Sequence, residues 1–325
     1  MKRPRRSFLH LAAGAAALPA VSRIASADTY PSRPVHLIVG FPPGGFVDAG
    51  GRLTGLWLSE RFGQQFVIEN RPGASGNVAT EAVAHAAPDG YTLLAASDAN
   101  AYNATLYDNL NFNFIRDIAP VASVGRAAYV MVVNPTFAAK TVPEFITYAK
   151  ANPRAVNMAS SGPGSSTQLF GQLFKGMAEI DLVTVNYRGP AAALLDLMSG
   201  RVEVMFTSVA SAIGYIKAGK LRALGVATAG PMDILPDVPA IGEFVPGYEA
   251  AGWVGIGAPA NTPDEIIAII NKQVDTALAD ATFKARLADL GMEPFANSPA
   301  EFGKFIVEYT EKWGKVIRAA NIKPE

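Results

Sequence analysis

The chain has 325 residues, with 28 basic and 28 acidic side chains and no cysteine. Without cysteine there is no disulfide framework, no thiolate nucleophile and no cysteine-ligated metal, so the fold must rest on its hydrophobic core. The lack of basic excess argues against nucleic acid or an anionic membrane surface as a partner, because both need clustered Lys and Arg.

The N-terminal segment predicts export. Arg5 and Arg6 form a twin-arginine pattern, an apolar stretch covers 11–18, and residues 25–27 (Ala-Ser-Ala) are typical of a cleavage site. The stretch is shorter than the roughly 20 apolar residues that span a membrane, and no later stretch is expected to span one. We therefore expect a signal peptide over residues 1–27, cleavage after Ala27 and a periplasmic protein. Its removal deletes five basic residues, which leaves 23 basic against 28 acidic side chains.

Apolar runs alternate with helix-length segments along the rest of the chain. Strands are predicted at 35–39, 66–69, 91–95, 129–133, 157–159, 182–186, 204–206, 221–227 and 252–257. Helices are predicted at 49–61, 142–151 and 191–199, and consecutively at 263–279, 281–290 and 299–320. The last helix carries an apolar stripe that we expect to pack in the core. Strands alternating with helices indicate an α/β fold with doubly wound, mostly parallel sheets.

Two glycine loops follow predicted strands and precede helix-like segments. The first is Phe41-Pro42-Pro43-Gly44-Gly45, and the second covers 160–166 (Ser-Ser-Gly-Pro-Gly-Ser-Ser). A glycine loop that opens a helix presents backbone N–H groups at the positive end of the helix, which suits a carboxylate or phosphate. Ligands of doubly wound sheets lie beyond the carboxyl ends of the strands. We therefore expect the two loops to hold one anion between them.

The candidate ligand-binding residues belong to these loops and to polar positions after neighbouring strands. Asp48 either complements the helix dipole as the third residue of its helix or touches the ligand through water. Hydroxyls of the second loop can cap its helix while the amides serve the ligand. The full set is Phe41, Gly44, Gly45, Asp48, Ser97, Asp98, Ser160, Ser161, Gly162, Gly164, Ser165, Ser166, Thr167, Tyr187, Arg188, Thr207 and Ser208.

Two charged candidates have further consequences. Asp98 follows a strand and stands beside the expected anion site, where a buried unpaired carboxylate is costly. We hypothesise that the ligand carries an amide, hydroxyl or ammonium group opposite Asp98. Arg188 either contacts a second carboxylate of the ligand or lies in a surface pair at the rim of the site.

Several motifs together resemble one family. They are Tyr30-Pro31, the first glycine loop with Asp48 and Arg52, 69–73 (ENRPG), Gly76-Asn77, 87–94 (APDGYTLL), 160–165, 235–239 (LPDVP) and 258–263 (APANTP). In this order they are similar to the Bug receptors, which are the extracytoplasmic solute receptors of tripartite tricarboxylate transporters. ENRPG combined with APDGYTLL is far more specific than a glycine loop alone. The resemblance covers the chain from Tyr30 to the C-terminal helices.

The resemblance implies a two-lobed periplasmic-binding-protein fold of the Venus-flytrap type. One lobe would cover 28–125 plus 250–325 and the other 126–249, each a doubly wound sheet flanked by helices. The lobes would close over a small organic anion, a carboxylate or an amino acid, held mostly by backbone amides and bridging waters, with no cofactor or metal. The receptor would be a monomer that delivers its ligand to the membrane permease subunits. At Thr167, Thr207 and Ser208 the chain departs from the family, so the resemblance does not fix ligand specificity.

Two alternatives stay open. An exported α/β hydrolase needs a base near a glycine loop, and the histidines after residue 27, His36 and His85, lie far from both loops in sequence. G-x-S-x-G, H-E-x-x-H and G-x-x-x-x-G-K-[ST] motifs are missing from the sequence. The other alternative is a receptor that reports to a signalling partner, which the sequence does not distinguish from a transport receptor.

Overall fold

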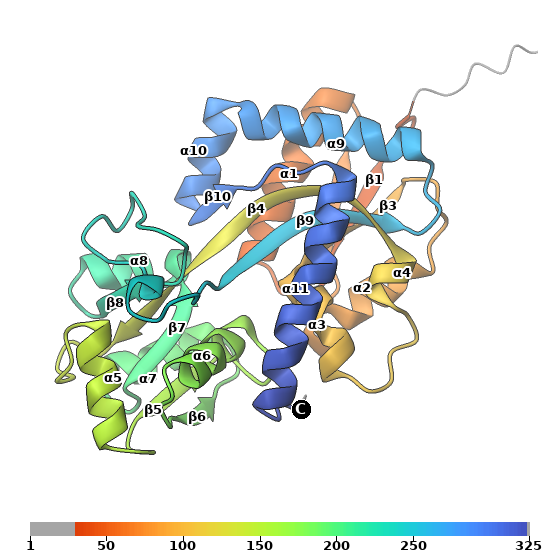
Figure 1. The fold of residues 1–325 in the computed structure, drawn as a ribbon. Coiled ribbons are helices and arrows are strands. Elements are labelled where there is room, and N and C mark those ends of the chain that lie inside the picture. Colours follow the sequence, from red (N-terminus) through yellow and green to blue (C-terminus); the bar gives the residue numbers. More distant parts are fainter. Residues whose placement is uncertain (1–29, 324–325) are drawn as a thin grey trace, which may run out of the picture.

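The computed structural model describes residues 30–323, which form two α/β lobes joined by a long strand and by the segment that returns from the second lobe to the first (Figure 1). The expected signal peptide and its cleavage site lie outside the described residues. No helix among the described residues has the length and apolar character needed to cross a membrane.

Lobe 1 is built on the first sheet, with strand order β2-β1-β3-β9-β4 and β10 beside β4. Three neighbouring strands are parallel, and β9 runs antiparallel between β3 and β4. The strands are β1 (Val35–Val39), β2 (Phe66–Asn70), β3 (Thr92–Ser97), β4 (Ile118–Val133), β9 (Ala251–Pro259) and β10 (Met292–Pro294). The helices are α1 (Phe46–Phe62), α2 (Asn77–Ala84), α3 (Asp98–Leu106), α4 (Phe114–Asp117), α9 (Asp264–Ala279), α10 (Ala281–Asp289) and α11 (Pro299–Ala319), with a 3₁₀ turn at Ala74–Gly76.

Lobe 2 is built on the second sheet, in which the last part of β4 lies between β7 and β8. Its strands β5 (Asn157–Ser160), β6 (Val183–Asn186) and β7 (Val204–Ser208) are parallel, and β8 (Arg222–Val226) pairs antiparallel with β4. The helices are α5 (Val142–Ala151), α6 (Ser166–Met177), α7 (Pro190–Ser199) and α8 (Val209–Lys217), with a 3₁₀ turn at Ile241–Glu243.

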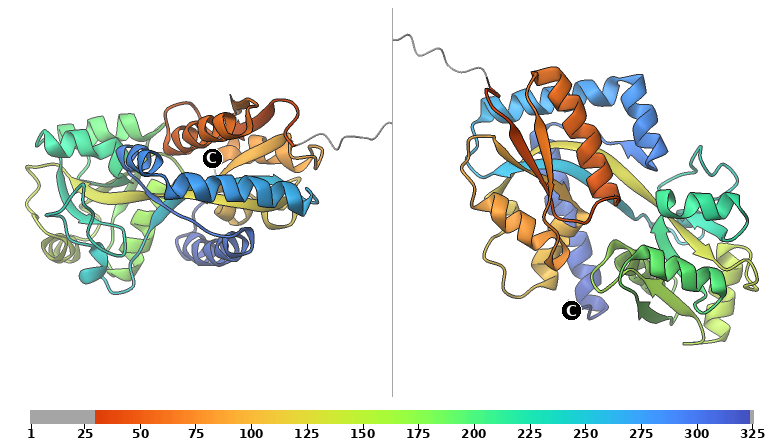
Figure 2. Two further views of the ribbon diagram at one scale, coloured as in Figure 1. Left: turned by 90° about the horizontal axis from the view of Figure 1, so that it is seen from above. Right: turned by 180° about the vertical axis from the view of Figure 1, so that it is seen from behind.

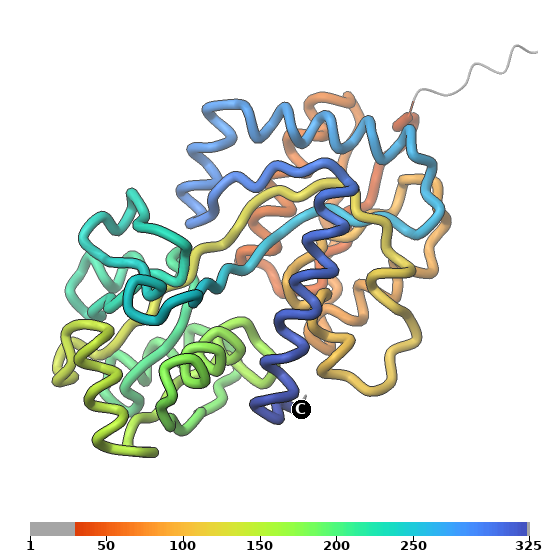
Figure 3. The backbone as a smooth tube through the Cα atoms, in the orientation of Figure 1, coloured from red at the N-terminus to blue at the C-terminus, as the bar shows by residue number. Residues whose placement is uncertain are grey.

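Strand β4 is longer than the sequence predicts. The expected strand at 129–133 is the C-terminal part of a strand of 16 residues that starts at Ile118. Its first part pairs with β9 in lobe 1, and its last part pairs with β7 and β8 in lobe 2. The sequence does not predict the first part of this strand, because it contains Pro120 and Gly125 and such residues usually interrupt strands. Here they lie at two irregularities of the β4–β9 pairing. The chain therefore crosses between the lobes within one continuous strand, which the tube in Figure 3 follows.

Helices α1 and α11 cover opposite faces of the first sheet (Figure 2). A Cβ added to Gly50 of α1 would meet Val254 of β9, whereas one added to the next residue of the strand, Gly255, would meet Phe302 of α11. The apolar stripe predicted for the last helix is confirmed as core, because Phe302 and Trp313 are fully buried. Helix α11 begins with a capping box between Ser298 and Glu301.

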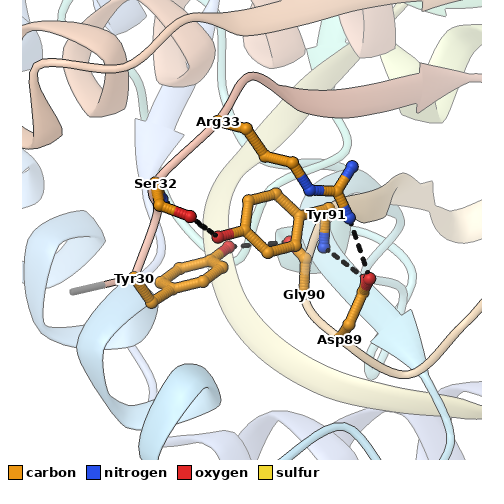
Figure 4. A network of polar contacts seen from close by, with 6 residues as sticks. All are labelled: Tyr30, Ser32, Arg33, Asp89, Gly90 and Tyr91. Carbon is orange, nitrogen blue, oxygen red and sulfur yellow. Dashed lines mark hydrogen bonds and ion pairs between the residues drawn. The ribbon is translucent and has the colours of Figure 1, made fainter. Parts of the chain in front are cut away.

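The first described residues are fastened to the turn before β3 (Figure 4). The Tyr30 hydroxyl donates to the Gly90 carbonyl at 2.7 Å, and the Arg33 guanidinium pairs with Asp89 at 3.0 Å. Gly90 has a φ of +79°, and a Cβ at this position would meet the Tyr30 ring. Asp89 and Gly90 belong to the APDGYTLL motif, so in this protein the motif joins the start of lobe 1 to its sheet.

Candidate ligand-binding site

The first glycine loop enters α1 without a side-chain cap. Gly45 is the N-cap residue and makes no side-chain hydrogen bond to the helix. Asp48 instead accepts hydrogen bonds from the Gly44 amide (2.9 Å), the Arg52 Nε (2.9 Å) and the Asn70 Nδ2 (2.7 Å). The Gly44 amide is thus occupied, and by position the unpaired amides at the start of α1 begin at Gly45.

The contacts of Asp48 set its charge. Burial alone would raise the pKa of this carboxyl group, but the hydrogen bonds from Arg52, Asn70 and Gly44 outweigh burial and lower it. The carboxylate stays charged at neutral pH and holds the loop against the helix. Asp48 lies in the first turn of α1, and both roles that the sequence left open, complementing the helix dipole and contacting the ligand through water, stay predictions.

The second glycine loop is held by hydrogen bonds within its own segment. Its amides are bonded within the segment: Ser161 N to Thr167 Oγ1 (2.8 Å), Gly162 N to Ser160 Oγ (3.1 Å) and Gly164 N to Gln168 Oε1 (2.7 Å). Ser165 is the N-cap residue of α6, and its hydroxyl accepts from the Gln168 amide. By position, the unpaired amides at this helix start are those of Ser166 and Thr167.

Helix α3 brings Asp98 into contact with the second loop. Ser97 caps α3, and its amide donates to Asn100 Oδ1 at 2.7 Å. The next residue, Asp98, is 1% exposed and accepts a hydrogen bond of 2.6 Å from the Ser166 hydroxyl of lobe 2. Burial raises the pKa of Asp98 to about 7, against the opposing effects of the Ser166 hydroxyl and the backbone amides of Asp98 and Ala99.

Gly252 of β9 lies where three elements meet. A Cβ at this residue would stand 3.3 Å from the rings of Phe46 and Tyr129 and 3.4 Å from Asp98 Oδ2. Phe46 is the first residue of α1, directly after the first glycine loop. The structure therefore brings the start of α1, the start of α3 and, through Ser166, the start of α6 to one place between the lobes.

Polar residues at the end of β7 and after β6 lie at the same end of the second sheet. Thr207 is 1% exposed, and its hydroxyl has no hydrogen-bond partner among the described residues. Ser208 caps α8 by accepting from the Ser211 amide. Tyr187 borders the second loop through its backbone, because its amide donates to the Ser160 carbonyl at 2.9 Å.

Other predicted residues are engaged elsewhere or exposed. The Tyr187 hydroxyl donates to Asp196 Oδ2 at 3.0 Å, and Asp196 also forms an ion pair with Arg201. Arg188 is exposed. Phe41 accepts at its carbonyl from Asn70 Nδ2 at 2.9 Å, and its ring lies beside Gly76. Contacts of these side chains with a ligand stay predictions.

The sequence did not reveal Phe46, Tyr102, Tyr129 and Gly252 as neighbours of the site. The Tyr102 hydroxyl lies 3.2 Å from the Ser166 hydroxyl, on the same face of α3 as Asp98. Tyr129 was predicted only as a strand residue. Gly252 carried one available signal, since a glycine in a strand often marks a close approach of other groups.

A hollow of about 520 Å³ lies elsewhere in lobe 2, beside β8. It is lined mainly by apolar residues such as Leu221 and Pro236, and shares no residue with the predicted ligand set. Its one cation, Arg222, already donates to the carbonyls of Pro135, Phe137 and Ala139. Among residues 30–323, no group of three or more His, Asp or Glu side chains is placed to hold a metal ion.

Comparison with known proteins gives consistent matches over most of the chain. Residues 52–322 match the family model described as tripartite tricarboxylate transporter family receptor. The chain is 35% identical over 292 residues to the UPF0065 protein in the tcbD-tcbE intergenic region of Pseudomonas sp. strain P51, with 89% of this chain and 87% of the relative covered. It is 32% identical over 301 residues to Protein BugT of Bordetella pertussis, with 92% of each covered.

Solved structures agree with this match. R. palustris Rpa4515 with adipate superposes with a TM-score of 0.82 and 34% identity, covering 91% of this chain and all of the other. MatC from Rhodopseudomonas palustris with bound malate superposes with a TM-score of 0.77 and 30% identity, covering 89% of this chain and all of the other.

Proposed function

Because the chain belongs to the tripartite tricarboxylate transporter receptor family, we propose that it captures a small carboxylate between its lobes and delivers it to the membrane subunits of such a transporter. The similar structures that contain adipate and malate support a carboxylate ligand. We further infer cleavage of the export signal after Ala27, lobes of 28–125 plus 250–325 and of 126–249, and a monomer that acts in the periplasm.

One observation carries the ligand assignment: the N-termini of helices from opposite lobes meet around Asp98 and Ser166. Each helix N-terminus carries a partial positive charge of about half a unit and first-turn amides without an intrahelical partner. The amides of Gly44, Gly162 and Gly164 are bonded within their own segments. These three glycines therefore shape the loops, and the amides that we propose for a carboxylate are those of Gly45 and of the first turns of α1 and α6.

Backbone hydrogen bonds alone can supply the binding free energy of such a site, without an arginine. A micromolar dissociation constant corresponds to about 8 kcal/mol. Four or five hydrogen bonds to a charged group, at roughly 1.5 to 3 kcal/mol each, reach that value. Arg52, which is near the first loop, already binds Asp48 at 2.9 Å.

Proline offers a direct test of the amides. It fits the first position of a helix and lacks an N–H group. We expect Phe46→Pro to weaken carboxylate binding at least about tenfold more than Phe46→Ala, since only the first variant removes the amide. Ser166→Pro and Ser166→Ala form the same matched pair in lobe 2.

Isothermal calorimetry with mono- and dicarboxylates, amino acids and uncharged analogues provides the measurement. We expect carboxylates to bind and to be recovered chemically unchanged. Binding confined to uncharged analogues, or equal affinities in the proline and alanine variants of both helices, would contradict the proposed ligand class and site.

A further inference from the structure

Asp98 is a buried carboxyl group at the contact between the lobes. Among the described residues, the side chain that donates a hydrogen bond to it is Ser166 of the opposite lobe, at 2.6 Å. The Ser166 hydroxyl is itself buried and lies 3.2 Å from the Tyr102 hydroxyl. Any separation of α6 from α3 therefore breaks the Asp98 hydrogen bond and admits water to the carboxyl group.

Within residues 30–323, no cation is among the groups that shift the pKa of Asp98. The titratable groups that face it are Tyr102 of α3, Tyr129 of β4 and Tyr309 of α11, and burial raises the pKa of all three well above neutrality. The other packed elements contribute the Phe46 ring of α1, Gly252 of β9 and the Ser166 hydroxyl.

Cations on these elements have other partners: Arg126 of β4 lies over the Phe295 ring and 3.8 Å from Glu249. Arg52 of α1 pairs with Asp48, and Lys312 of α11 donates to the Glu249 carbonyl at 2.7 Å. In the part of the chain that the structure describes, the Ser166 hydroxyl and the amides at the start of α3 stabilise a negative charge on Asp98, and burial disfavours it.

We propose that Asp98 and Ser166 form a proton-sensitive latch between the lobes. Closing the lobes buries the Asp98 carboxyl group under Ser166 and takes up a proton from the solvent. Acidification from slightly alkaline to mildly acidic pH thus favours the closed arrangement. This inference rests on the proposed function in one respect: the cleft that the latch closes is the cleft proposed to capture the ligand.

The direction of the pH effect on lobe closure follows from the pKa of the carboxyl group in the closed and open arrangements. In the closed arrangement the pKa of Asp98 is raised to about 7, from an ordinary value of 3.8 that water access restores when the lobes open. Between these pH values the closed state binds more protons than the open state. The closing equilibrium constant then rises up to about tenfold for each pH unit of acidification. A ligand carboxylate near Asp98 adds negative charge to the cleft, so its capture is accompanied by proton uptake.

The test measures lobe closure without a ligand, so that its outcome does not depend on the ligand class. Because the chain has no cysteine, Leu56→Cys in α1 and Leu195→Cys in α7, both exposed, accept a pair of fluorescent labels. We expect energy transfer to show increasing closure from pH 8 to pH 5 in the otherwise unchanged protein, and no such change with Asp98→Asn. Asp196→Asn, which alters a partly buried carboxylate of lobe 2 that pairs with Arg201, should keep the pH response.

A second measurement needs no variant. In protein labelled with ¹³C at aspartate carboxyl groups, the Asp98 signal should titrate with a midpoint near 7, well above those of the exposed aspartates. A pH-independent lobe distance, a response that persists in Asp98→Asn, or an Asp98 midpoint near 4 would each overturn the latch. Failure of carboxylates to bind in calorimetry would count against the proposed function and leave these readings unaffected.

Discussion

The indole of Trp313, near the end of α11, packs against the ring of Phe170 in α6, with ring centroids 4.9 Å apart. Phe170 also lies against Tyr129 of β4, at 4.6 Å. Both Trp313 and Phe170 are fully buried. Helix α11 belongs to lobe 1 by its packing on β9, so its last turns reach across to lobe 2. Separation of the lobes must expose this aromatic contact to water.

Removal of the Trp313 side chain should lower the free energy of unfolding by a large amount. Trp313→Ala is expected to lower the free energy of unfolding by roughly 3 to 5 kcal/mol, the range for removing a large buried aromatic side chain. Denaturation with urea, followed by far-UV circular dichroism, measures the change. Val307→Ala on the exposed side of α11 is the control, with an expected change within about 0.5 kcal/mol. A loss below 1 kcal/mol in Trp313→Ala would show that the contact contributes little.

Gly164 is expected to tolerate no side chain. It has a φ of +69°, and a Cβ would lie 2.6 Å from Leu106 Cδ1 of α3. Gly164→Ala should lower the free energy of unfolding by about 1 to 3 kcal/mol through overpacking and strain. In calorimetric unfolding, the loss in Gly164→Ala combined with Leu106→Ala should be smaller than the sum of the two single losses, because removal of the Leu106 side chain removes the clash.

Gly44 and Gly176 provide the matched controls for Gly164. Gly44 also has a positive φ, of +92°, but no atom lies within 4 Å of its Cβ position, so Gly44→Ala should show only backbone strain of about 1 kcal/mol. Gly176, inside α6 with open space around it, should become slightly more stable with alanine. Equal losses at Gly164 and Gly176 would refute the importance of the Leu106 contact.

Thr207 should matter for binding and not for folding. Thr207→Val removes its unpartnered hydroxyl at nearly constant shape, so the free energy of unfolding should be unchanged or higher by up to about 1 kcal/mol. If the hydroxyl faces ligand or its bridging water, carboxylate affinity should fall about tenfold in calorimetry. In Thr54→Val the lost hydroxyl donates to Gly50 at 2.8 Å, so this control should lose about 1 kcal/mol of stability and keep its affinity. Unaltered affinity in Thr207→Val would remove Thr207 from the site.

Asp48 should confer stability that acid removes. Its hydrogen bonds hold its pKa below the ordinary value of 3.8, so its contribution is fully present above that value and is lost as the pH falls through the lowered pKa. Asp48→Asn should reduce the free energy of unfolding at pH 7 by about 1.5 to 3 kcal/mol, the value of hydrogen bonds to a charged group. The difference between the two proteins should shrink below pH 4 in acid denaturation curves. A difference that is constant from pH 7 to pH 2 would contradict this role.

Much of the fold could be predicted from the sequence, because most strands are short apolar runs bounded by turn residues. The run at 35–39 coincides with β1, and the three C-terminal helices agree within one residue at each end. Helix α3 was not predicted, because its buried face carries Asn100 and Asn103 and lacks an apolar stripe. Those side chains bond to Thr80 and Asn77 of α2, partners that only the folded chain supplies.

The candidate site could be predicted in part. Glycine loops and N-cap residues are local signals, so both helix starts were found. Which amides are occupied depends on contacts such as Gln168 with Gly164 and Asp48 with Gly44. The bond between Asp98 and Ser166 joins residues 68 positions apart, and no local pattern indicates such a pair.

The position of β9 also governs the order in which the molecule can assemble. β9 separates β3 from β4 in the first sheet, although both precede it by more than a hundred residues in the chain. All the strands of the second sheet lie between residues 118 and 226. During synthesis the second sheet has its full complement of strands first, while the earlier half of the first sheet waits for a partner made much later. A truncated chain ending before residue 251 would leave the inner edge of β3 open to pairing with other chains.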